Sequence, residues 1–414
     1  MQQRKLEIEV FEHESLRVGD KGIKQHHIDA LWRLNEYHDN SYFEPIARGV
    51  KFKQYVGIIQ VNGLSIEIHP KADKYSSDTV WKDVLLDMLK ACGRIKSSTN
   101  GPATLKKRNL NLLEVYFEYF LNEVSGLMHR GLIKQYRKQT KNTKALKGKL
   151  EFSGHIQRNT IHKERFYTTH QVYDTDHTIH QILAKALSIV EQFSKGTYLY
   201  DYCKRTALDF PEVKQLNVNA SHFKNLKKDR KTAPYDYALE LARLIILNYS
   251  PDISSGKEKM LSLLFDMNQL WEEYVLIQLQ KYTRINHPEL TVTGQEIKKF
   301  WGSNTIRPDI VIKNSQTQET LVIDTKWKNI GNGPPSIQDL RQMYGYARYW
   351  NANKVMLLYP GENRTSHFKP FLSEHDESQQ HCKIGVINII KDDKLDVGIG
   401  ERIIEVLEYN KLEV

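Results

Sequence analysis

The sequence predicts a multidomain α+β protein: a β-rich N-terminal module, a helical middle region and a C-terminal α/β core. Near the N-terminus apolar and polar residues alternate, as in half-buried strands. In the middle, apolar residues recur every three or four positions, as in amphipathic helices. The last third alternates helical patterns with short apolar runs. We place the three parts at residues 1–95, 96–250 and 251–414.

The N-terminal module is predicted to contain a strand at Leu6–Val10 and a helix at His27–His38. A hairpin follows at Tyr55–Ile68, with Asn62-Gly63 as a type I′ turn. Ser77 and Asp78 are predicted to cap the next helix. Because the module has neither an acid pair nor a glycine-rich phosphate loop, it indicates binding or docking.

The middle region begins with a predicted helix at Leu110–Leu127, whose aromatic stripe we interpret as core. An exposed basic segment follows, and its candidate DNA-binding residues are Lys134, Arg137, Lys138, Lys141, Lys144 and Lys147. They fit phosphate contacts or a solvated loop equally. The acids and histidines at 170–180 indicate the capped start of a helix rather than a metal site.

The C-terminal part is predicted to alternate helices and strands, which is typical of an α/β core. The expected elements are a helix from Lys259 through Gln280, a strand near 291–297, a hairpin, a helix at 336–350, a strand at 355–359, a polar loop at 361–381, a strand at 384–390 and a helix at 402–407.

The hairpin carries the residues with the clearest chemistry. Asp309 opens its first strand, Asp324 ends its second, and Lys326 leaves the same face as Asp324. In an antiparallel pair, residues whose numbers sum to about 634 lie opposite one another, so both aspartates reach one end. Carboxylates that bind Mg²⁺, beside a lysine, are suited to phosphodiester hydrolysis. A soluble edge hairpin is the alternative.

Four further residues are candidates for this site or its DNA contacts. Glu272 lies on the preceding predicted helix, although Glu273 could equally be the inward acid. Gln342 and Tyr346 are four apart and share a helical face. Arg341 and Arg348, on the same helix, suit phosphate contacts; the alternative for this helix is an ordinary polar surface.

Composition adds a weaker indication. The 414 residues carry 60 Lys+Arg against 50 Asp+Glu, a net charge of +10 that favours a polyanionic partner such as DNA. The three cysteines are far apart and lack a CxxC pair, so they indicate reduced thiols. Without an apolar signal or a membrane-spanning run, we expect a cytoplasmic protein with no membrane partner.

These motifs resemble a known nuclease superfamily. Pro308-Asp309 followed by Asp324-Thr325-Lys326 resembles the PD-(D/E)XK signature, and Gln342 to Tyr346 is similar to its QxxxY motif. The resemblance implies Mg²⁺, with Mn²⁺ as a substitute, held by Asp309, Asp324, the Thr325 carbonyl and Glu272. It implies that Lys326 activates water, and that cleavage leaves a 5′-phosphate.

A broader resemblance covers most of the chain. The 56–71 hairpin, the Leu146–Leu150 segment and the RPDI and DTKW motifs are similar to the McrC family, the nuclease subunits of McrBC-type modification-dependent restriction systems. Trp271 stands where that family often has Phe. The resemblance implies a partner McrB-like AAA+ GTPase ring, which the chain would stimulate. Because double-strand cutting usually needs two sites, we also expect an McrC–McrC dimer.

The sequence therefore predicts a Mg²⁺-dependent DNA endonuclease subunit of a McrBC-like restriction complex. One alternative is a self-sufficient PD-(D/E)XK nuclease in DNA repair or defence, which would cut without a GTPase. The other is a non-cutting adaptor that activates an AAA+ ring; the intact Asp309, Asp324 and Lys326 count against it.

Overall fold

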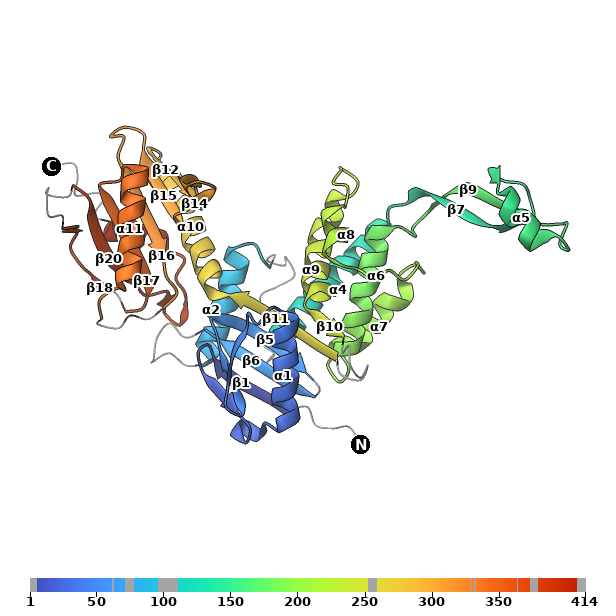
Figure 1. Cartoon of the computed structure of the whole chain (residues 1–414), viewed down its shortest axis with the longest axis horizontal. Coiled ribbons are helices and arrows are strands. Elements are labelled where there is room, and N and C mark those ends of the chain that lie inside the picture. The colour runs from blue at the N-terminus through green and yellow to red at the C-terminus, as the bar shows by residue number, and fades with distance from the viewer. Residues whose placement is uncertain are drawn as a thin grey trace. The chain divides into compact units, whose positions relative to one another are not determined.

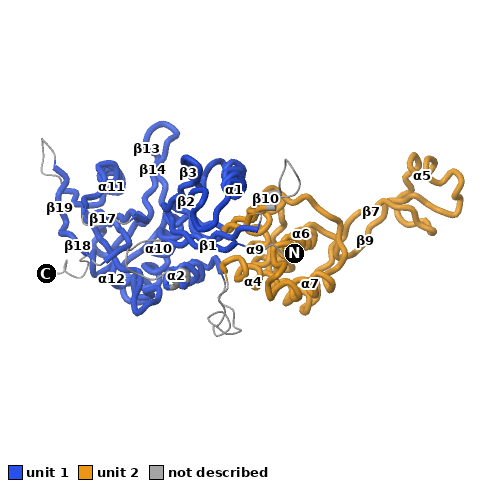
Figure 2. Tube along the Cα trace, turned by 90° about the horizontal axis from the view of Figure 1, so that it is seen from below, with its two compact units in different colours: residues 1–58, 63–102, 264–414 blue, residues 59–62, 103–263 orange. Residues whose placement is uncertain are grey.

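A computed structural model describes residues 6–61, 63–70, 78–95, 111–251, 259–328, 330, 333–362, 364–372 and 379–407. The chain forms two compact units (Figure 2). Unit 1 comprises residues 1–58, 63–102 and 264–414, and unit 2 comprises residues 59–62 and 103–263. The N-terminal and C-terminal segments of the chain thus contribute to the same unit. The predicted three-part division stays a prediction.

The N-terminal segment contributes strands to two small sheets. Strands β1 (Leu6–Phe11), β6 (Leu64–His69), β5 (Tyr55–Val61), β11 (Lys259–Asp266) and β10 (Tyr249–Pro251) form the first sheet in that order. The second has the order β2 (Ser15–Arg17), β4 (Gly49–Phe52), β3 (Phe43–Ile46). Helix α1 (Gln25–Tyr37) packs on β3 and β4, and α2 (Asp78–Ala91) packs on β6. The predicted strand, helices and hairpin strands are all present. Asn62, Lys71 and Ser77 lie outside the described residues.

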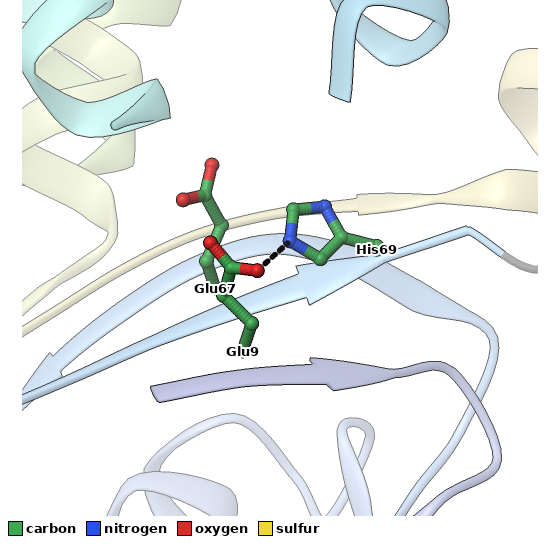
Figure 3. Close-up of side chains that lie close together, drawn as sticks. All are labelled: Glu9, Glu67 and His69. Carbon is green, nitrogen blue, oxygen red and sulfur yellow. Dashed lines mark ion pairs between the residues drawn. The ribbon is translucent and has the colours of Figure 1, made fainter. Parts of the chain in front are cut away.

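Strands β1 and β6 are parallel, and their register brings ionisable side chains together. Glu9 lies opposite Glu67, and Phe11 opposite His69. Since alternate residues of a strand share a face, Glu9, Glu67 and His69 lie on the same side of the sheet. Figure 3 shows the three side chains pointing toward one another, with an ion pair between His69 and Glu9.

Unit 2 is built on packed helices (Figure 1). These are α4 (Leu112–Arg130), α6 (Thr178–Phe193), α7 (Leu199–Asp209), α8 (Ala220–Lys224) and α9 (Asp236–Leu247). Asn111 caps α4 and exchanges hydrogen bonds with Glu114, as in a capping box. The aromatic residues of α4 are buried, including Tyr116 and Phe120 at 0% exposure. The interpretation of this stripe as core is therefore confirmed.

The basic segment is not a loop. Residues Gln135–Thr143 form strand β7, which pairs antiparallel along its whole length with β9 (Phe166–Asp174). With β8 (Lys149–Leu150) and α5 (Phe152–Asn159) they form an arm that extends from the helices of unit 2 (Figure 1). The solvated loop, which the sequence left open as one alternative, does not form. The strand gave no sequence signal because both faces of β7 are largely exposed, so no apolar alternation marks it.

Two other predictions need correction. Residues 259–266 form strand β11, whereas the sequence predicted the start of a helix; α10 begins at Met267 and ends at Asn286. A short apolar run fits a buried strand and a helix equally well. The residue that precedes α6 is His177, and it makes no side-chain capping bond. Instead, Asp176 accepts hydrogen bonds from Gln181 and from the Lys214 backbone, so the predicted side-chain cap is absent.

The C-terminal segment forms a mixed sheet. Its strand order is β12 (Leu290–Gly294), β15 (Ile310–Asn314), β16 (Thr320–Thr325), β17 (Lys354–Pro360), β20 (His381–Ile387), β18 (Arg364–Thr365), and β19 (Lys369–Pro370) also pairs with β20. Strands β12, β15 and β16 are antiparallel, whereas β16, β17 and β20 are parallel. The remaining elements are β13 (Lys298–Trp301), β14 (Asn304–Ile306), α11 (Ile337–Trp350), β21 (Ile390–Lys391), β22 (Lys394–Leu395) and α12 (Ile399–Val406).

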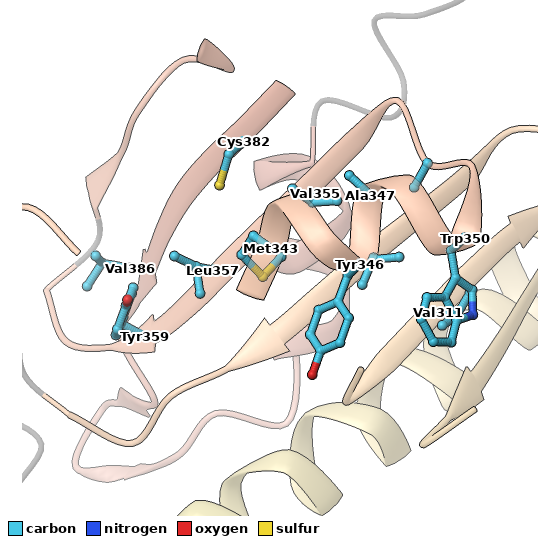
Figure 4. Close-up of a cluster of buried hydrophobic side chains, with 12 residues drawn as sticks. Val311, Met343, Tyr346, Ala347, Trp350, Val355, Leu357, Tyr359, Cys382 and Val386 are labelled. Atoms are coloured by element: carbon cyan, nitrogen blue, oxygen red, sulfur yellow. The ribbon is translucent and has the colours of Figure 1, made fainter. Parts of the chain in front are cut away.

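Helix α11 makes the crossover between the parallel strands β16 and β17 and packs on both (Figure 1). Its apolar face enters a core that also includes Val311, Val322 and Leu357 (Figure 4). Met343, Ala347 and Trp350 of α11 are 0 to 4% exposed. This packing fixes which residues of α11 face the end of β16. Among the described residues, no helix is long and apolar enough to cross a membrane.

Candidate active site

The hairpin brings the two aspartates to one end of its ladder. Ile310 lies opposite Ile323 and Val311 opposite Val322, so paired numbers sum to 633, one less than predicted. Asp309 therefore lies opposite Asp324, although it stands just before β15. Thr325 ties the two strands together, because its backbone N–H and its hydroxyl donate to Asp309 Oδ2 at 2.6 and 2.8 Å.

Lys326 completes the predicted trio. Its Nζ lies 2.7 Å from Asp324 Oδ2, and its backbone N–H donates to the Leu358 carbonyl at 2.9 Å. The Asp324 side chain is 2% exposed and the Lys326 side chain 25% exposed. The ion pair is therefore partly shielded from water, with Lys326 as its more exposed member.

Gln342 and Tyr346 join the same network from α11. Lys326 Nζ donates to Gln342 Oε1 at 3.2 Å, and Gln342 Nε2 donates to the Tyr346 hydroxyl at 2.8 Å. That hydroxyl donates to the Arg307 carbonyl at 2.9 Å, two residues before Asp309. Burial, reinforced by the charge of Asp324, raises the pKa of Tyr346 to about 12, so its hydroxyl stays protonated. The predicted QxxxY pair thus holds the amine of Lys326.

The structure distinguishes the two adjacent glutamates of α10. Glu273 forms an ion pair with Arg94 at 2.8 Å. Glu272 is half-buried and accepts from Gln295 Nε2 at 2.6 Å. Burial, and then repulsion from Asp309, raises the pKa of Glu272. Of the two glutamates, Glu272 is therefore the one whose charge is coupled to Asp309.

The carboxylates of the site are electrostatically costly. Burial, followed by repulsion from Asp309, raises the pKa of Asp324 above its usual range despite Lys326. Burial also raises the pKa of Asp309, although Thr325 donates two hydrogen bonds to it. Burial lowers the pKa of Lys326, but the attraction and hydrogen bond of Asp324, together with the charges of Asp309 and Asp339, make the net shift upward. Crowded negative charge of this kind favours a bound cation.

Hard oxygen donors fit Mg²⁺, and their spacing indicates how they would hold it. Among the described residues, the only three acids or histidines whose donor atoms all lie within 4.8 Å of one another are Glu9, Glu67 and His69. Asp309, Asp324 and Glu272 are therefore more widely spaced. Because Mg²⁺ keeps several waters and uses only one or two carboxylates, this wider set fits the ion with water between some donors.

The sequence did not indicate a second ion pair beside the site. Lys328 Nζ lies 2.6 Å from Asp339 Oδ2, and the Tyr359 hydroxyl donates to the same oxygen at 3.5 Å. The charge of Asp339 also acts on Asp324. Two features of the sequence could have indicated the pair. Lys328 is two residues beyond Lys326, the spacing of side chains on one face of a strand. Asp339 is three residues after Ser336, which caps α11, and so lies in the first turn of that helix.

The Glu9, Glu67 and His69 cluster was also missed. It could have been found from the E-x-H pattern on β6 together with its parallel pairing to β1. His69 is 2% exposed, and its Nε2 lies 3.8 Å from Glu9 Oε2. Glu9 and His69 form an ion pair when His69 is protonated, and the Glu9 side chain is 60% exposed.

The predicted DNA-binding residues fall into two groups. Lys134, Lys138, Lys141, Lys144 and Lys147 are exposed in unit 2, on or beside β7. Arg137 is engaged by Asp174 and Asp176, at 2.9 and 3.2 Å. Because strand residues alternate between faces, Lys138 and Lys141 leave opposite sides of β7 and do not form one stripe. Arg341 and Arg348 are exposed on α11 of unit 1, seven residues apart and so on one helical face.

The chain is similar to known proteins of one family. The family model described as "McrBC 5-methylcytosine restriction system component" matches residues 50–360. The chain is 23% identical over 257 residues to the Escherichia coli (strain K12) protein described as "Type IV methyl-directed restriction enzyme EcoKMcrBC", covering 57% of this chain and 72% of that protein.

Two solved structures share the fold. One is a refined half-complex from a tetradecameric assembly of Thermococcus gammatolerans McrB AAA+ hexamers with bound McrC; the match has a TM-score of 0.70 and 21% identity, and covers 98% of this chain and 100% of the other. The other is the McrBC complex of the same organism, with a TM-score of 0.51 and 21% identity, covering 66% and 87% of the two chains.

Proposed function

Because this chain belongs to the family of McrBC 5-methylcytosine restriction system components, we propose that it is the DNA-cutting, McrC-type subunit of such a system. The observation that carries the proposal is the convergence of Asp309, Asp324 and Lys326 at one end of the hairpin. The raised pKa values of the two buried carboxylates support it, since strongly perturbed groups that lie together are typical of active sites.

We propose that the mixed sheet of unit 1 is a PD-(D/E)XK nuclease core. The hairpin β15–β16, the parallel neighbours β17 and β20, and the crossover helix α11 support this assignment. The assignment gives each functional side chain its element: Glu272 comes from α10, the aspartates and lysine from the hairpin, and Gln342 and Tyr346 from α11.

In this proposal Asp309, Asp324 and the Thr325 carbonyl hold Mg²⁺, or Mn²⁺ in its place, and Glu272 acts through water. The cation would lower the pKa of a bound water and offset charge on the scissile phosphate. The Lys326 ammonium group donates a hydrogen bond to the attacking water or to a phosphate oxygen. Gln342, held by Tyr346, keeps the Lys326 amine beside Asp324.

The partner in this proposal is an McrB-like AAA+ GTPase ring, as in the related Thermococcus gammatolerans assembly of McrB with bound McrC. The exposed lysines of the arm and Arg341 and Arg348 of α11 would contact DNA phosphates. This chain would then cut DNA and stimulate GTP hydrolysis by the ring.

The test is cleavage of methylated plasmid DNA in Mg²⁺ by wild-type chain and by Asp324→Ala, each with and without an McrB-type partner and GTP. We expect cutting only when partner and GTP are present, and a loss of about 10²- to 10³-fold with the substitution, the scale on which loss of a key electrostatic group acts. Cutting by the chain alone would favour an independent nuclease. If wild type does not cut, yet both versions raise GTP turnover equally, the chain is an adaptor.

A further inference from the structure

A buried acid of the N-terminal segment reaches the nuclease motif. Glu12 directly follows β1 and is 4% exposed. Its Oε1 accepts a hydrogen bond of 2.7 Å from Trp327 Nε1, across 315 positions of sequence within unit 1. A carboxylate buried to this extent is destabilising unless it is hydrogen-bonded, so the indole N–H offsets part of the cost of burying Glu12.

Trp327 directly follows Lys326 and is fixed on its other sides by aromatic rings. Its ring lies edge-on to Trp81 of α2, with centroids 6.5 Å apart, and to Trp271 of α10 at 5.8 Å. Trp271 is 0% exposed and stands next to Glu272. The indole is thus surrounded by the N-terminal segment and by the helix that carries the third acid of the site.

This anchorage determines where Lys326 points. Lys326 directly precedes Trp327, and the Lys328 N–H donates to the Lys326 carbonyl at 3.0 Å, so the backbone turns at Trp327 and a fixed indole restrains the peptide that carries Lys326. The Lys326 backbone is also held, through its N–H, to the Leu358 carbonyl. Fixing the indole therefore limits rotation of the backbone that aims the amine.

We propose that Glu12 is a positioning residue for the segment Asp324–Trp327, so that the N-terminal segment of the chain helps to set the geometry of the cleavage site. This proposal rests on the proposed nuclease function for its catalytic consequence. It also makes the N-terminal segment a route by which a partner bound there would act on cleavage, because displacement of β1 removes the acceptor of the Trp327 indole.

The first test measures the segment itself by hydrogen exchange in the full chain, which needs no activity. Glu12→Leu and Trp327→Phe both remove the hydrogen bond, whereas Glu12→Gln keeps an acceptor. We expect amides of peptides that cover residues 324–328 to exchange about tenfold faster in the first two variants, and at the wild-type rate in Glu12→Gln. Glu7→Leu, at an exposed acid of β1, is the matched control. Wild-type exchange in both Glu12→Leu and Trp327→Phe would overturn the proposal.

The second test is the cleavage assay with partner and GTP. A misplaced Lys326 should lower kcat about tenfold or more with KM unchanged, since small errors in the placement of reacting groups are costly. Rescue by Glu12→Gln separates positioning from a general loss of structure. Faster exchange with unchanged kcat would refute the positioning role. Faster exchange in a chain whose wild type does not cut would support the anchorage and count against the proposed function.

Discussion

At the scale of single residues, the site brings buried carboxylates close together, and without a bound cation their negative charge destabilises the fold. Asp324 is 1% exposed and lies beside Asp309, and burial followed by this repulsion raises its pKa. A carboxyl whose pKa is higher in the folded than in the unfolded chain contributes stability that is fully present below its unfolded pKa, which is roughly 3.9. That contribution is lost as the pH rises through the folded pKa. The active site should therefore weaken the metal-free protein at neutral and basic pH.

We expect Asp324→Asn to raise the melting temperature of metal-free protein at about pH 8, and the difference from wild type to shrink as the pH falls toward about 5. The gain should be a few degrees, on the scale of roughly 2–4 °C per kcal/mol for a domain of 150–250 residues. Mg²⁺ should stabilise only the wild type. Calorimetry in chelator and in Mg²⁺ measures both effects.

Asp83→Asn provides the control, because Asp83 is an exposed acid on α2. It should leave the melting temperature within about 1 °C of wild type at each pH, as expected for most exposed positions. A metal-free Asp324→Asn protein that melts below wild type at about pH 8 would contradict the electrostatic account of the site.

At the scale of elements, the basic segment of unit 2 forms the polar strand β7, which is part of the arm. Its side chains do not act alike, because Arg137 is held by Asp174 and Asp176 whereas Lys138 and Lys141 are exposed. Removal of Arg137 leaves two acids without their cation and loosens β7 against β9, so its effect on DNA binding would be indirect. The exposed lysines are the better probes of a phosphate contact.

We expect the double variant Lys138→Ala/Lys141→Ala to weaken binding of duplex DNA uniformly across sequences. If both lysines contact phosphates, the slope of log affinity against log salt should fall in magnitude by about 2. Fluorescence anisotropy over a salt series measures this slope. Lys195→Ala, an exposed lysine of unit 2 outside the arm, should not change it. An unchanged slope in the double variant would mean that the arm does not contact DNA.

At the scale of the whole molecule, each chain offers one Asp309, Asp324 and Lys326 site, and under the proposed function one site would cut one strand at a time. Double-strand cutting therefore calls for two chains or two successive events. We expect active complexes to contain paired copies of this chain, in which each copy cuts one strand.

Mixing wild-type chain with excess Asp324→Ala before addition of partner and GTP should convert linear plasmid products into nicked circles, because most pairs would hold one inactive site. Gel electrophoresis distinguishes the two products. An equal excess of the control Asp83→Asn chain should leave linear product dominant. If the ratio of nicked to linear product stays at the wild-type value in the Asp324→Ala mixture, one chain cuts both strands.

The sequence by itself determined which residues meet at the hairpin. Strand pairing follows from apolar runs and their connection, so Asp309, Asp324 and Lys326 could be placed together, within one position of the observed register. The helical spacing of Gln342 and Tyr346 was likewise a local property, and it gave their shared face. The polar strand β7 was missed because exposed pairing leaves no apolar signal.

Only the tertiary structure decided the contacts between distant segments. Glu273 pairs with Arg94, which leaves Glu272 as the candidate acid of the site. Gln342 accepts a hydrogen bond from Lys326, and Glu12 accepts one from Trp327. No periodicity encodes such contacts, because they depend on how helices and sheets pack after each has formed. The same packing buries the aspartates and so raises their pKa values. The local sequence pattern thus determines which chemical groups are present, and the long-range packing determines their pKa values and the positions of their side chains.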